Sequence, residues 1–483
     1  MKLFSNLSAV HSAHFCRHTG NSYVAKVPVI FGALLLSLSV GASDEYPEAD
    51  EFIVAAPVYK SLSKDSILDV YQRAKTFDAE YRQAQQKNLA DVEGYIQARG
   101  RLMPELSIYA EERQSDQDIV ASDIDVIGSG QSDFDTTIYG ANLSQPLFDW
   151  ERFMRFNQSK QERALAEVEL LQSQQVLQLK VAERYLTVLA AQDNLDFSEK
   201  EEVAILAQES AAKKRYDAEV GRKVDYLEAT ARASSVYADK VAAKNILDDA
   251  IEAVREVSGA GTDNYARLKD NLQLVAASPD VLDRWVDLAM QNSLPVQLQR
   301  YALSVAEYEI ERQKGNRYPT VSLYGRINNE EQGGSLFGGS SEVETTEIGV
   351  RFNMNLFEGG SSNSRIREAA YRYNAEMDAL HNEMRRATRE TRSAFLDLKT
   401  SMTKIGSLMK GVDAQQAVVE TKRKGYPSLY TNREVLDSER DLYSVKRDLA
   451  KARYDYLLAD LRLKAAVGSL SEQDFIRINA FFQ

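Results

Sequence analysis

"VRFNMNLFEGG" (350–360) alternates apolar and polar residues and then gives way to a long stretch with helical periodicity. The alternation places one apolar and one polar face on the same strand. Its apolar members are Ile348, Val350, Phe352, Met354 and Leu356, and its polar members are Glu347, Gly349, Arg351, Asn353 and Asn355. A similar joint, "ANLSQPLFDWE" (141–151), occurs earlier in the chain. The sequence therefore predicts two places where a strand leads into a long helix.

The chain repeats itself at a spacing of about 210 residues, which indicates one duplicated unit. "PELSIYA" (104–110) corresponds to "PTVSLYG" (319–325), and "DYLEA" (225–229) corresponds to "EVLDS" (434–438). We predict the order helix, strand, polar loop, strand, very long helix, break, helix in each half. The predicted segments are a signal peptide (1–42), an N-terminal extension (43–62), a first repeat (63–258), a linker (259–279), a second repeat (280–468) and a C-terminal tail (469–483).

The predicted strands have the weak alternation of outer-membrane strands, about ten residues each. Polar stretches at 116–133 and 328–346 are typical of exposed hairpin loops. The same alternation also fits a half-buried soluble sheet. Four strands cannot close a barrel, and an open edge in lipid leaves backbone groups unpaired. If these strands span a bilayer, several chains must share one barrel.

The predicted helices are unusually long. No proline occurs in 151–215 or 360–424, and at about 1.5 Å per residue each helix would be roughly 100 Å long. Alternating three- and four-residue steps form a coiled-coil seam at Leu442, Val445, Leu449, Ala452, Tyr456, Ala459, Leu463 and Ala466. A coiled-coil rod is the simpler alternative, although it leaves the strand hairpins and the export signal unexplained.

The N-terminus has the pattern of a secretory signal peptide. Residues 1–42 contain no Asp or Glu, carry Lys2, Arg17 and Lys26, and include an apolar run before the small residues Gly41 and Ala42. A retained membrane anchor is the alternative, but the run is short for a spanning helix of about 20 residues. Removing the three cationic residues takes the formal charge from −13 to −16.

This composition argues against several function classes. The only cysteine, Cys16, lies in the signal segment without a lipoprotein pattern, so we expect no disulfide, thiolate site or lipid anchor. The acidic balance argues against nucleic acid as a partner. No metal-ligand spacing, nucleophile elbow or phosphate loop is evident, and His381 sits in a charged helical stretch. We therefore predict no enzyme activity, catalytic residue, metal site or cofactor.

Several stretches resemble the TolC family of outer-membrane efflux and secretion channels. The most specific is "EVLDSERDLYSVKRDLAKARYDYLLADLRLKAAVGSL" (434–470), which is similar to the last helix of that family, and the "PLFD" and "LFEGG" joints match as well. The similarity extends from about Ser63 to Ser471. Without a lipoprotein cysteine, the chain looks more like the type I secretion channels than the acylated drug-efflux channels.

The resemblance implies a fold that is mainly helical with membrane β-structure. Three chains would each give four strands to one twelve-stranded barrel, continuous with a periplasmic α-helical barrel. The strand–helix joints would carry Pro146 and the Gly359-Gly360 pair, which relieve the backbone. Aromatic rings of Phe148, Trp150 and Phe357 would lie near the periplasmic edge of the membrane; ordinary packing at a strand end is the alternative.

The resemblance also implies a gate at the periplasmic end of the helices. By motif, Asp225, Glu434 and Asp437 would face the channel axis there. Threefold symmetry would make rings of like charge that attract cations and raise the pKa values of the carboxylates. Possible cationic partners of the closed gate are Arg222, Lys223 and Arg433. Solvated helix-face charges are the alternative interpretation.

We accordingly predict a passive export duct in the outer membrane of a Gram-negative cell, with its helices in the periplasm. Its expected partners are two further copies of the chain, outer-membrane lipid, a periplasmic adaptor and an inner-membrane ABC transporter or other pump. The leading hypothesis is type I secretion of a protein such as an adhesin or toxin. A multidrug or metal efflux component is the second hypothesis, and a non-channel periplasmic coiled-coil or adaptor protein is the third.

Overall fold

A computed structural model describes residues 65–119, 130–260, 264–269, 278–334, 339–426 and 428–482 of the chain. The predicted signal peptide (1–42) and N-terminal extension (43–62) lie outside the described residues, as does part of the predicted linker (259–279). The structural statements below concern the described ranges.

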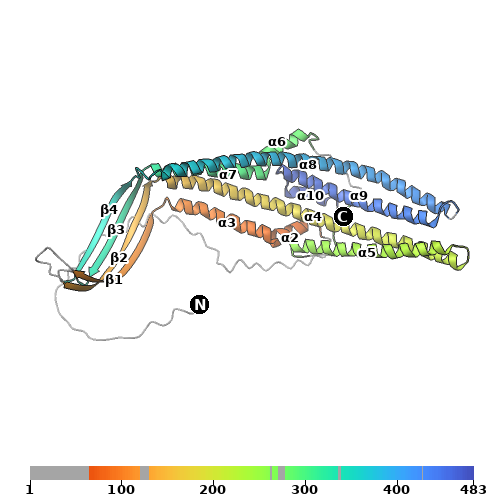
Figure 1. The fold of residues 1–483 in the computed structure, drawn as a ribbon, viewed down its shortest axis with the longest axis horizontal. Helices are drawn as coiled ribbons and strands as arrows, with labels where there is room; N and C mark the ends of the chain where they lie inside the picture. The colour runs from red at the N-terminus through yellow and green to blue at the C-terminus, as the bar shows by residue number, and fades with distance from the viewer. Residues whose placement is uncertain are drawn as a thin grey trace, which may run out of the picture. The chain divides into compact units, whose positions relative to one another are not determined.

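The elements follow the same order in the two halves, as the repeat predicts (Figure 1). The first half contains α2 (Ile67–Phe77), α3 (Ala79–Gly100), β1 (Glu105–Ile119), β2 (Gly130–Phe148), α4 (Trp150–Asp217) and α5 (Lys223–Ser258). The second contains α6 (Leu282–Asn292), α7 (Leu294–Lys314), the 3-10 turn η2 (Gly315–Arg317), β3 (Thr320–Gln332), β4 (Ser341–Asn353), α8 (Ser361–Gly425) and α9 (Asn432–Ala466), followed by α10 (Glu472–Asn479). In each half, two strands precede a very long helix and a shorter one.

The strands form one antiparallel sheet in the order β1-β2-β3-β4. The register aligns Leu106, Leu143, Gly325 and Ile348 across one face. That face is uncovered in the chain, because Ile108 and Ile348 are 84% and 81% exposed. The sheet therefore presents an open apolar face, and β1 and β4 are its two edges.

The strands are longer than predicted. β1 and β2 run into the stretch 116–133, and β3 and β4 run into 328–346, which we had expected to be polar loops. The predicted loop bounds were wrong because backbone pairing continues where the side chains become polar, and only side-chain alternation is visible in a sequence. Residues 120–129 and 335–338 of these loops lie outside the described residues.

The first strand–helix joint is a single residue. β2 ends at Phe148, and Asp149 caps α4 by accepting a hydrogen bond of 3.0 Å from the backbone N–H of Arg152. The pairing of β2 with β3 shifts register between Pro146 and Phe148. Proline cannot donate a ladder hydrogen bond, so it suits this irregular strand end.

The second joint is longer than the sequence predicted. β4 ends at Asn353, so Met354 and Leu356 continue the alternation without continuing the strand. Residues 354–360 form the connection, and Gly359 and Gly360 adopt φ angles of 60° and 86°. No other residue favours such angles as glycine does, so the glycine pair suits the turn that leads into α8.

The aromatic residues of the two joints have different surroundings. Trp150 packs near Tyr318, with ring centroids 5.6 Å apart. Phe148 and Phe357 are 43% and 88% exposed. Their placement at a membrane edge stays a prediction.

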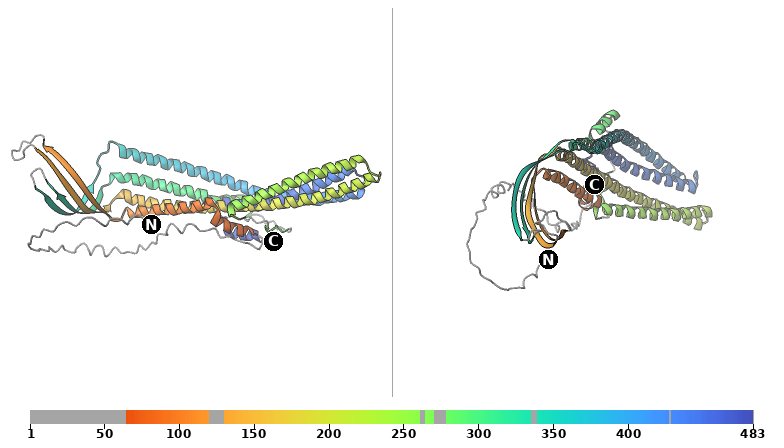
Figure 2. Two further views of the ribbon diagram at one scale, coloured as in Figure 1. Left: turned by 90° about the horizontal axis from the view of Figure 1, so that it is seen from below. Right: turned by 60° about the vertical axis from the view of Figure 1, so that its left-hand side comes forward.

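The helices are arranged in two zones. Near the strands, α3, α4, α7 and α8 lie side by side in that order (Figures 1 and 2). Farther along, α4 pairs with α5, α8 pairs with α9, and α9 also contacts α4. The seam predicted along α9 faces inward, with Leu442, Ala452 and Leu463 buried. The fold thus consists of two helical hairpins joined along α4 and α9.

The largest core lies where α2 and α10 pack against the middle of the long helices. Tyr71 and Phe475 are completely buried, with ring centroids 5.0 Å apart. Phe482 packs edge-on against Tyr185 at 5.6 Å. The described part of the predicted C-terminal tail (469–483) is therefore part of this core. Within the described residues, no helix is long and apolar enough to cross a membrane.

Candidate functional site at the helix tips

The two helix breaks lie next to each other at the end of the hairpins. Residues 218–222 connect α4 to α5, and residues 426–431 connect α8 to α9. The side-chain amide of Asn432 donates a 3.2 Å hydrogen bond to the backbone carbonyl of Asp225. The structure therefore brings the acidic motifs of both repeats, which are far apart in the sequence, to one place.

Each predicted gate residue is held by its own segment of chain. The Arg222 guanidinium donates to Asp225 at 2.7 Å, and the Asp225 side chain is 16% exposed. Asp437 is half exposed and lies 3.8 Å from Arg433. Lys223 is exposed at the first position of α5. Two of the three predicted cations thus pair locally, along the helix, within the single chain.

Glu434 differs from the other two carboxylates because it closes the N-terminus of α9. Its carboxylate accepts the backbone N–H of Thr431 at 2.7 Å and the Thr431 hydroxyl at 2.8 Å. These hydrogen bonds lower the pKa of Glu434. The expected rise in carboxylate pKa concerned rings formed by several chains; within one chain, the capping box keeps Glu434 ionised.

Aromatic contacts also join the two breaks. The Arg215 guanidinium of α4 lies over the ring of Tyr426, 4.7 Å from its centroid. Tyr216 stacks on Tyr226 across the first break at 6.1 Å. Arg215 and Tyr426 could not be predicted from the sequence, because a cation–π pair between repeats has no signature in either segment alone.

A buried ion network lies behind the tips. Glu201 of α4 is 5% exposed and accepts hydrogen bonds from Arg232 of α5 at 2.7 Å and from Arg447 of α9 at 3.0 Å. A buried carboxylate needs such partners because it has lost its water. The network therefore ties the hairpin α4–α5 to α9 of the other repeat.

A second buried carboxylate joins α8 to α9. Glu439 is 1% exposed and accepts a 2.6 Å hydrogen bond from Arg423. Burial raises the pKa of Glu439, and the Arg423 charge opposes that rise. Glu439 follows Ser438, which is the seam position before Leu442, so the apolar pattern gives no signal of its burial.

The Glu439 carboxylate predicts a pH-dependent stability. A raised folded-state pKa means that the folded chain binds the Glu439 proton more tightly than the unfolded chain does. The stabilisation that this proton gives to the folded state is therefore present at acidic pH and is lost as pH rises through the folded-state pKa. We expect Glu439→Gln to be more stable than the wild type at pH 8, with the difference disappearing near pH 4. The apparent melting temperature in detergent, followed by helical circular dichroism, measures this. Asp448→Asn, an exposed carboxylate on the same helix, is the control; parallel pH profiles for wild type and Glu439→Gln would contradict the assignment.

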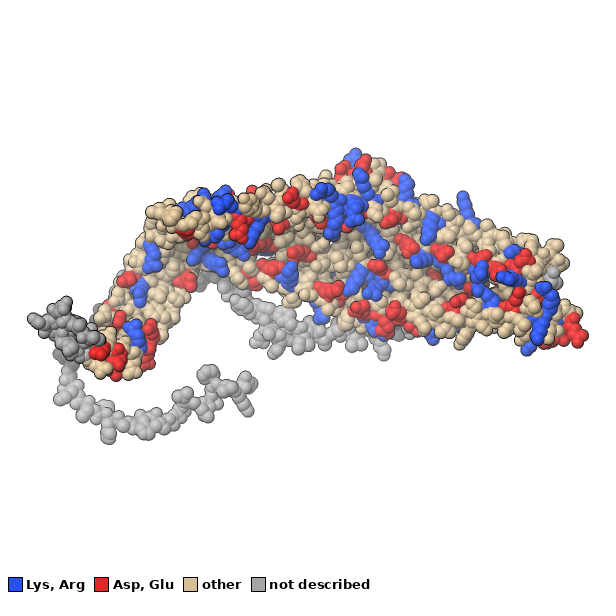
Figure 3. Space-filling view, in the orientation of Figure 1, with Lys and Arg blue, Asp and Glu red and all other residues tan. Residues whose placement is uncertain are grey.

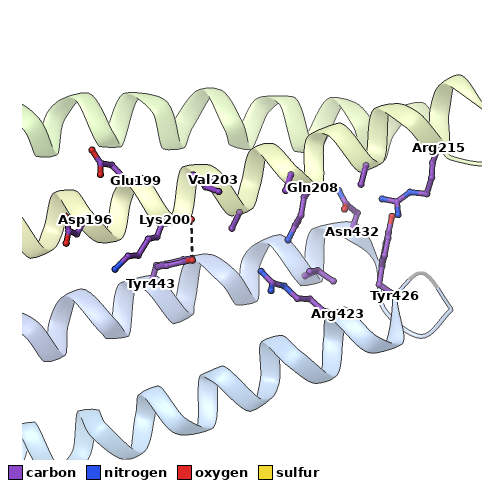
Figure 4. A pocket seen from close by; sticks show the side chains of 14 residues that line it. Asp196, Glu199, Lys200, Val203, Gln208, Arg215, Arg423, Tyr426, Asn432 and Tyr443 are labelled. Carbon is purple, nitrogen blue, oxygen red and sulfur yellow. Dashed lines mark hydrogen bonds between the residues drawn. The ribbon is translucent and has the colours of Figure 1, made fainter. Parts of the chain in front are cut away.

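An open groove of about 940 Å³ runs beside this network, between α4 and the α8–α9 hairpin (Figure 4). Val203 and Val435 contribute apolar surface, while Arg423 and Gln208 project toward each other across it. The Tyr443 hydroxyl donates to the backbone carbonyl of Lys200 at 3.3 Å. The groove is thus a partly apolar surface next to the tips, bordered by both repeats.

Charges of both signs are interleaved along the helices on the visible face (Figure 3). Among the described residues, no group of three or more His, Cys, Asp or Glu side chains could hold a metal ion. His381 lies exposed on α8. The described site contains ion pairs, hydrogen bonds and a groove.

This architecture matches that of a known protein family. A family model described as "Outer membrane efflux protein" matches residues 70–260 and 285–469. The chain belongs to this family. It is an outer-membrane export channel with a TolC-like fold, and its helical part lies in the periplasm. The resemblance that the sequence suggested is confirmed.

Several proteins of this family are similar to this chain over most of its length. TolC of Vibrio cholerae is 26% identical over 419 residues, covering 86% of this chain and 93% of that protein. The alkaline protease secretion protein AprF of Pseudomonas aeruginosa is 27% identical over 419 residues, covering 86% and 87%. The solved CmeC outer membrane channel of Campylobacter jejuni has a TM-score of 0.72 at 15% identity, covering 86% of this chain and 89% of that one, and supports the fold.

Proposed function

We propose that this channel is the passive outer-membrane duct of a type I secretion system and that it exports a protein. The observation that carries the proposal is the combination of an open four-stranded sheet with helices of 68 and 65 residues, α4 and α8. The helices, at about 1.5 Å per residue, are roughly 100 Å long. Such lengths suit a duct that crosses the periplasm.

The proposed assembly is a homotrimer. β1 and β4 are unpaired edges, and an edge in lipid leaves backbone groups without partners at a cost of several kcal/mol each. Pairing β1 of one chain with β4 of the next removes both edges. Three chains then contribute twelve strands, with the exposed apolar face toward lipid and the polar face toward a water-filled interior.

The helix tips are the proposed gate. Asp225, Glu434 and Asp437 lie at the breaks of both hairpins, and threefold symmetry would repeat each of them around the axis. We propose that an inner-membrane ABC transporter supplies the energy and that a periplasmic adaptor binds at the tips and opens them. The groove between α4 and the α8–α9 hairpin is the surface that we assign to the adaptor.

Similarity to AprF, whose name describes alkaline protease secretion, supports a protein as cargo. The family's description as efflux proteins supports the second candidate, a drug or metal efflux component. Deleting the gene and measuring both extracellular protein and drug or metal sensitivity separates the two. Loss of one abundant secreted protein with unchanged sensitivity supports type I secretion; the reverse supports efflux.

The proposed duct predicts discrete conductance. Mature protein purified from outer membranes in detergent should crosslink as a trimer and give uniform, cation-preferring current steps in a planar bilayer, because water-filled symmetric pores of one size conduct alike. The variant Ile348→Arg places a charge on the apolar face and should reduce insertion by a cost of about 2–4 kcal/mol per chain at mid-membrane. Monomers without conductance would overturn the proposal.

A further inference from the structure

The polar face of the sheet carries two similar clusters, one spanning β1, β2 and β3 and the other on β3 and β4. Cross-strand partners share a face, so the register places Tyr109, Gly140 and Asn328 in one row and Tyr324 and Gly349 in another. Both tyrosines lean over the glycine of the neighbouring strand. A Cβ built on Gly140 would lie 2.9 Å from the Tyr109 hydroxyl oxygen, and one on Gly349 would lie 2.7 Å from the Tyr324 hydroxyl oxygen. Only glycine leaves room for these rings.

In the first cluster, an arginine is fixed against the tyrosine. The Arg326 guanidinium lies 5.8 Å from the Tyr109 ring centroid and donates to its hydroxyl from Nε at 3.2 Å and from Nη2 at 3.1 Å. The Tyr109 hydroxyl in turn donates to Asn328 at 2.9 Å. The ring and the amide therefore hold the guanidinium in one orientation, while the arginine itself stays exposed.

In the second cluster, the Arg351 guanidinium lies 4.9 Å from the centroid of the Tyr324 ring. Arg351 is also exposed. Among the described residues, no carboxylate lies within 4.0 Å of either guanidinium, although Glu347 stands opposite Arg326 in the register. Both arginines therefore keep N–H donors that are directed to solvent and have no ion-pair partner.

We propose that Arg326 and Arg351 form a binding site for carboxylate groups on the inner wall of the strand region. The inference rests on the proposed function, because it takes the polar face to line the conducting path. A guanidinium offers paired N–H donors that match a carboxylate, and stacking on a tyrosine removes part of the entropy cost of holding it in place. In a trimer, the two clusters repeat around the axis, so the strand region holds local sites for anionic groups while the helix tips attract cations.

Together with Arg326 and Arg351, this face carries four carboxylates and three guanidinium groups, so it is slightly acidic as a whole and the attraction of anions is local to the two clusters. The alternation places Glu105, Glu111, Glu330, Glu347 and Arg113 on the same face. Arg351 stands opposite Ser322, so it is the less compensated of the two arginines. The carboxylates that bind belong either to acidic side chains of a polypeptide or to small free anions.

The test is block of single-channel current from the side of the strands. Citrate and an oligoglutamate peptide are added separately to wild type and to Arg326→Gln/Arg351→Gln. Loss of two charged donors should raise the half-blocking concentration of one or both probes by at least about tenfold. A shift with the peptide assigns the site to polypeptide carboxylates; a shift with citrate alone assigns it to small anions.

Two further variants keep the test decisive. Arg326→Lys/Arg351→Lys retains the positive charge and serves as the test if the glutamine variant fails to form trimers. Its block should be weaker than that of the wild type, because an ammonium lacks the planar pair of donors of a guanidinium. Arg389→Gln on α8, where the arginine side chain is 76% exposed, is the matched control and should leave block unchanged. Equal block in wild type and in both double variants would overturn the proposal, whereas a wild type without conductance would overturn the duct itself.

Discussion

We expect that neutralising the three carboxylates at the helix tips lowers the cation preference that we propose for the channel. We expect Asp225→Asn/Glu434→Gln/Asp437→Asn to reduce the ratio of potassium to chloride permeability by at least about threefold, because clefts lined by one sign of charge concentrate counterions. The reversal potential across a potassium chloride gradient in a planar bilayer measures this. Glutamine suits position 434 because it can still close the capping box with Thr431.

The structure also ranks the three residues. Asp225 is paired with Arg222 at 2.7 Å, and Asp437 lies 3.8 Å from Arg433. Glu434 accepts only neutral donors from Thr431, so its charge is the least compensated. We expect Glu434→Gln alone to give the largest single effect. The matched control replaces the exposed Asp239, Asp248 and Asp249 of α5 by Asn. An equal change of the permeability ratio in that control would show that the overall charge of the protein, and not a gate at the tips, determines ion selectivity.

Much of the fold could be predicted because its signals are local. The absence of proline and the seam along 442–466 predict the long helices, and the alternation at 348–352 predicts a strand. The ends of helices and strands were harder to predict from the sequence. Met354 and Leu356 continue the strand pattern, yet the strand ends at Asn353 because pairing partners decide where a strand stops.

The candidate site was predicted only where one segment carries its motif. Asp225, Glu434 and Asp437 were predicted in this way from the family motif, and their role at a gate stays a prediction; the structure brings their segments together through Asn432. The partners of Glu201 could not be found from sequence, because Arg232 and Arg447 lie on two other helices. The fold determines which helices are neighbours. Buried ion pairs between the repeats can therefore be identified only from the three-dimensional structure.

The network around Glu201 predicts a large loss of stability when its cations are removed. Arg232→Met/Arg447→Met leaves a carboxylate that is 5% exposed without either ion-pair partner. Breaking a buried ion pair in this way costs about 3–5 kcal/mol. We expect a markedly lower apparent melting temperature in detergent, measured by loss of helical circular dichroism, and faster dissociation of trimers.

Removing the carboxylate as well separates electrostatics from packing. In Glu201→Met/Arg232→Met/Arg447→Met, no charge is left unpaired, and replacing a whole buried ion network by apolar side chains of similar volume is often neutral or stabilising. The triple variant should therefore recover most of the stability that the double variant loses. If the triple variant is as unstable as the double variant, the arginine stems stabilise the hairpins by packing, and the ion pairs contribute little. Recovery of stability together with altered gating would instead indicate that Glu201 couples α4 and α5 to α9, so that the two hairpins move together when the tips open.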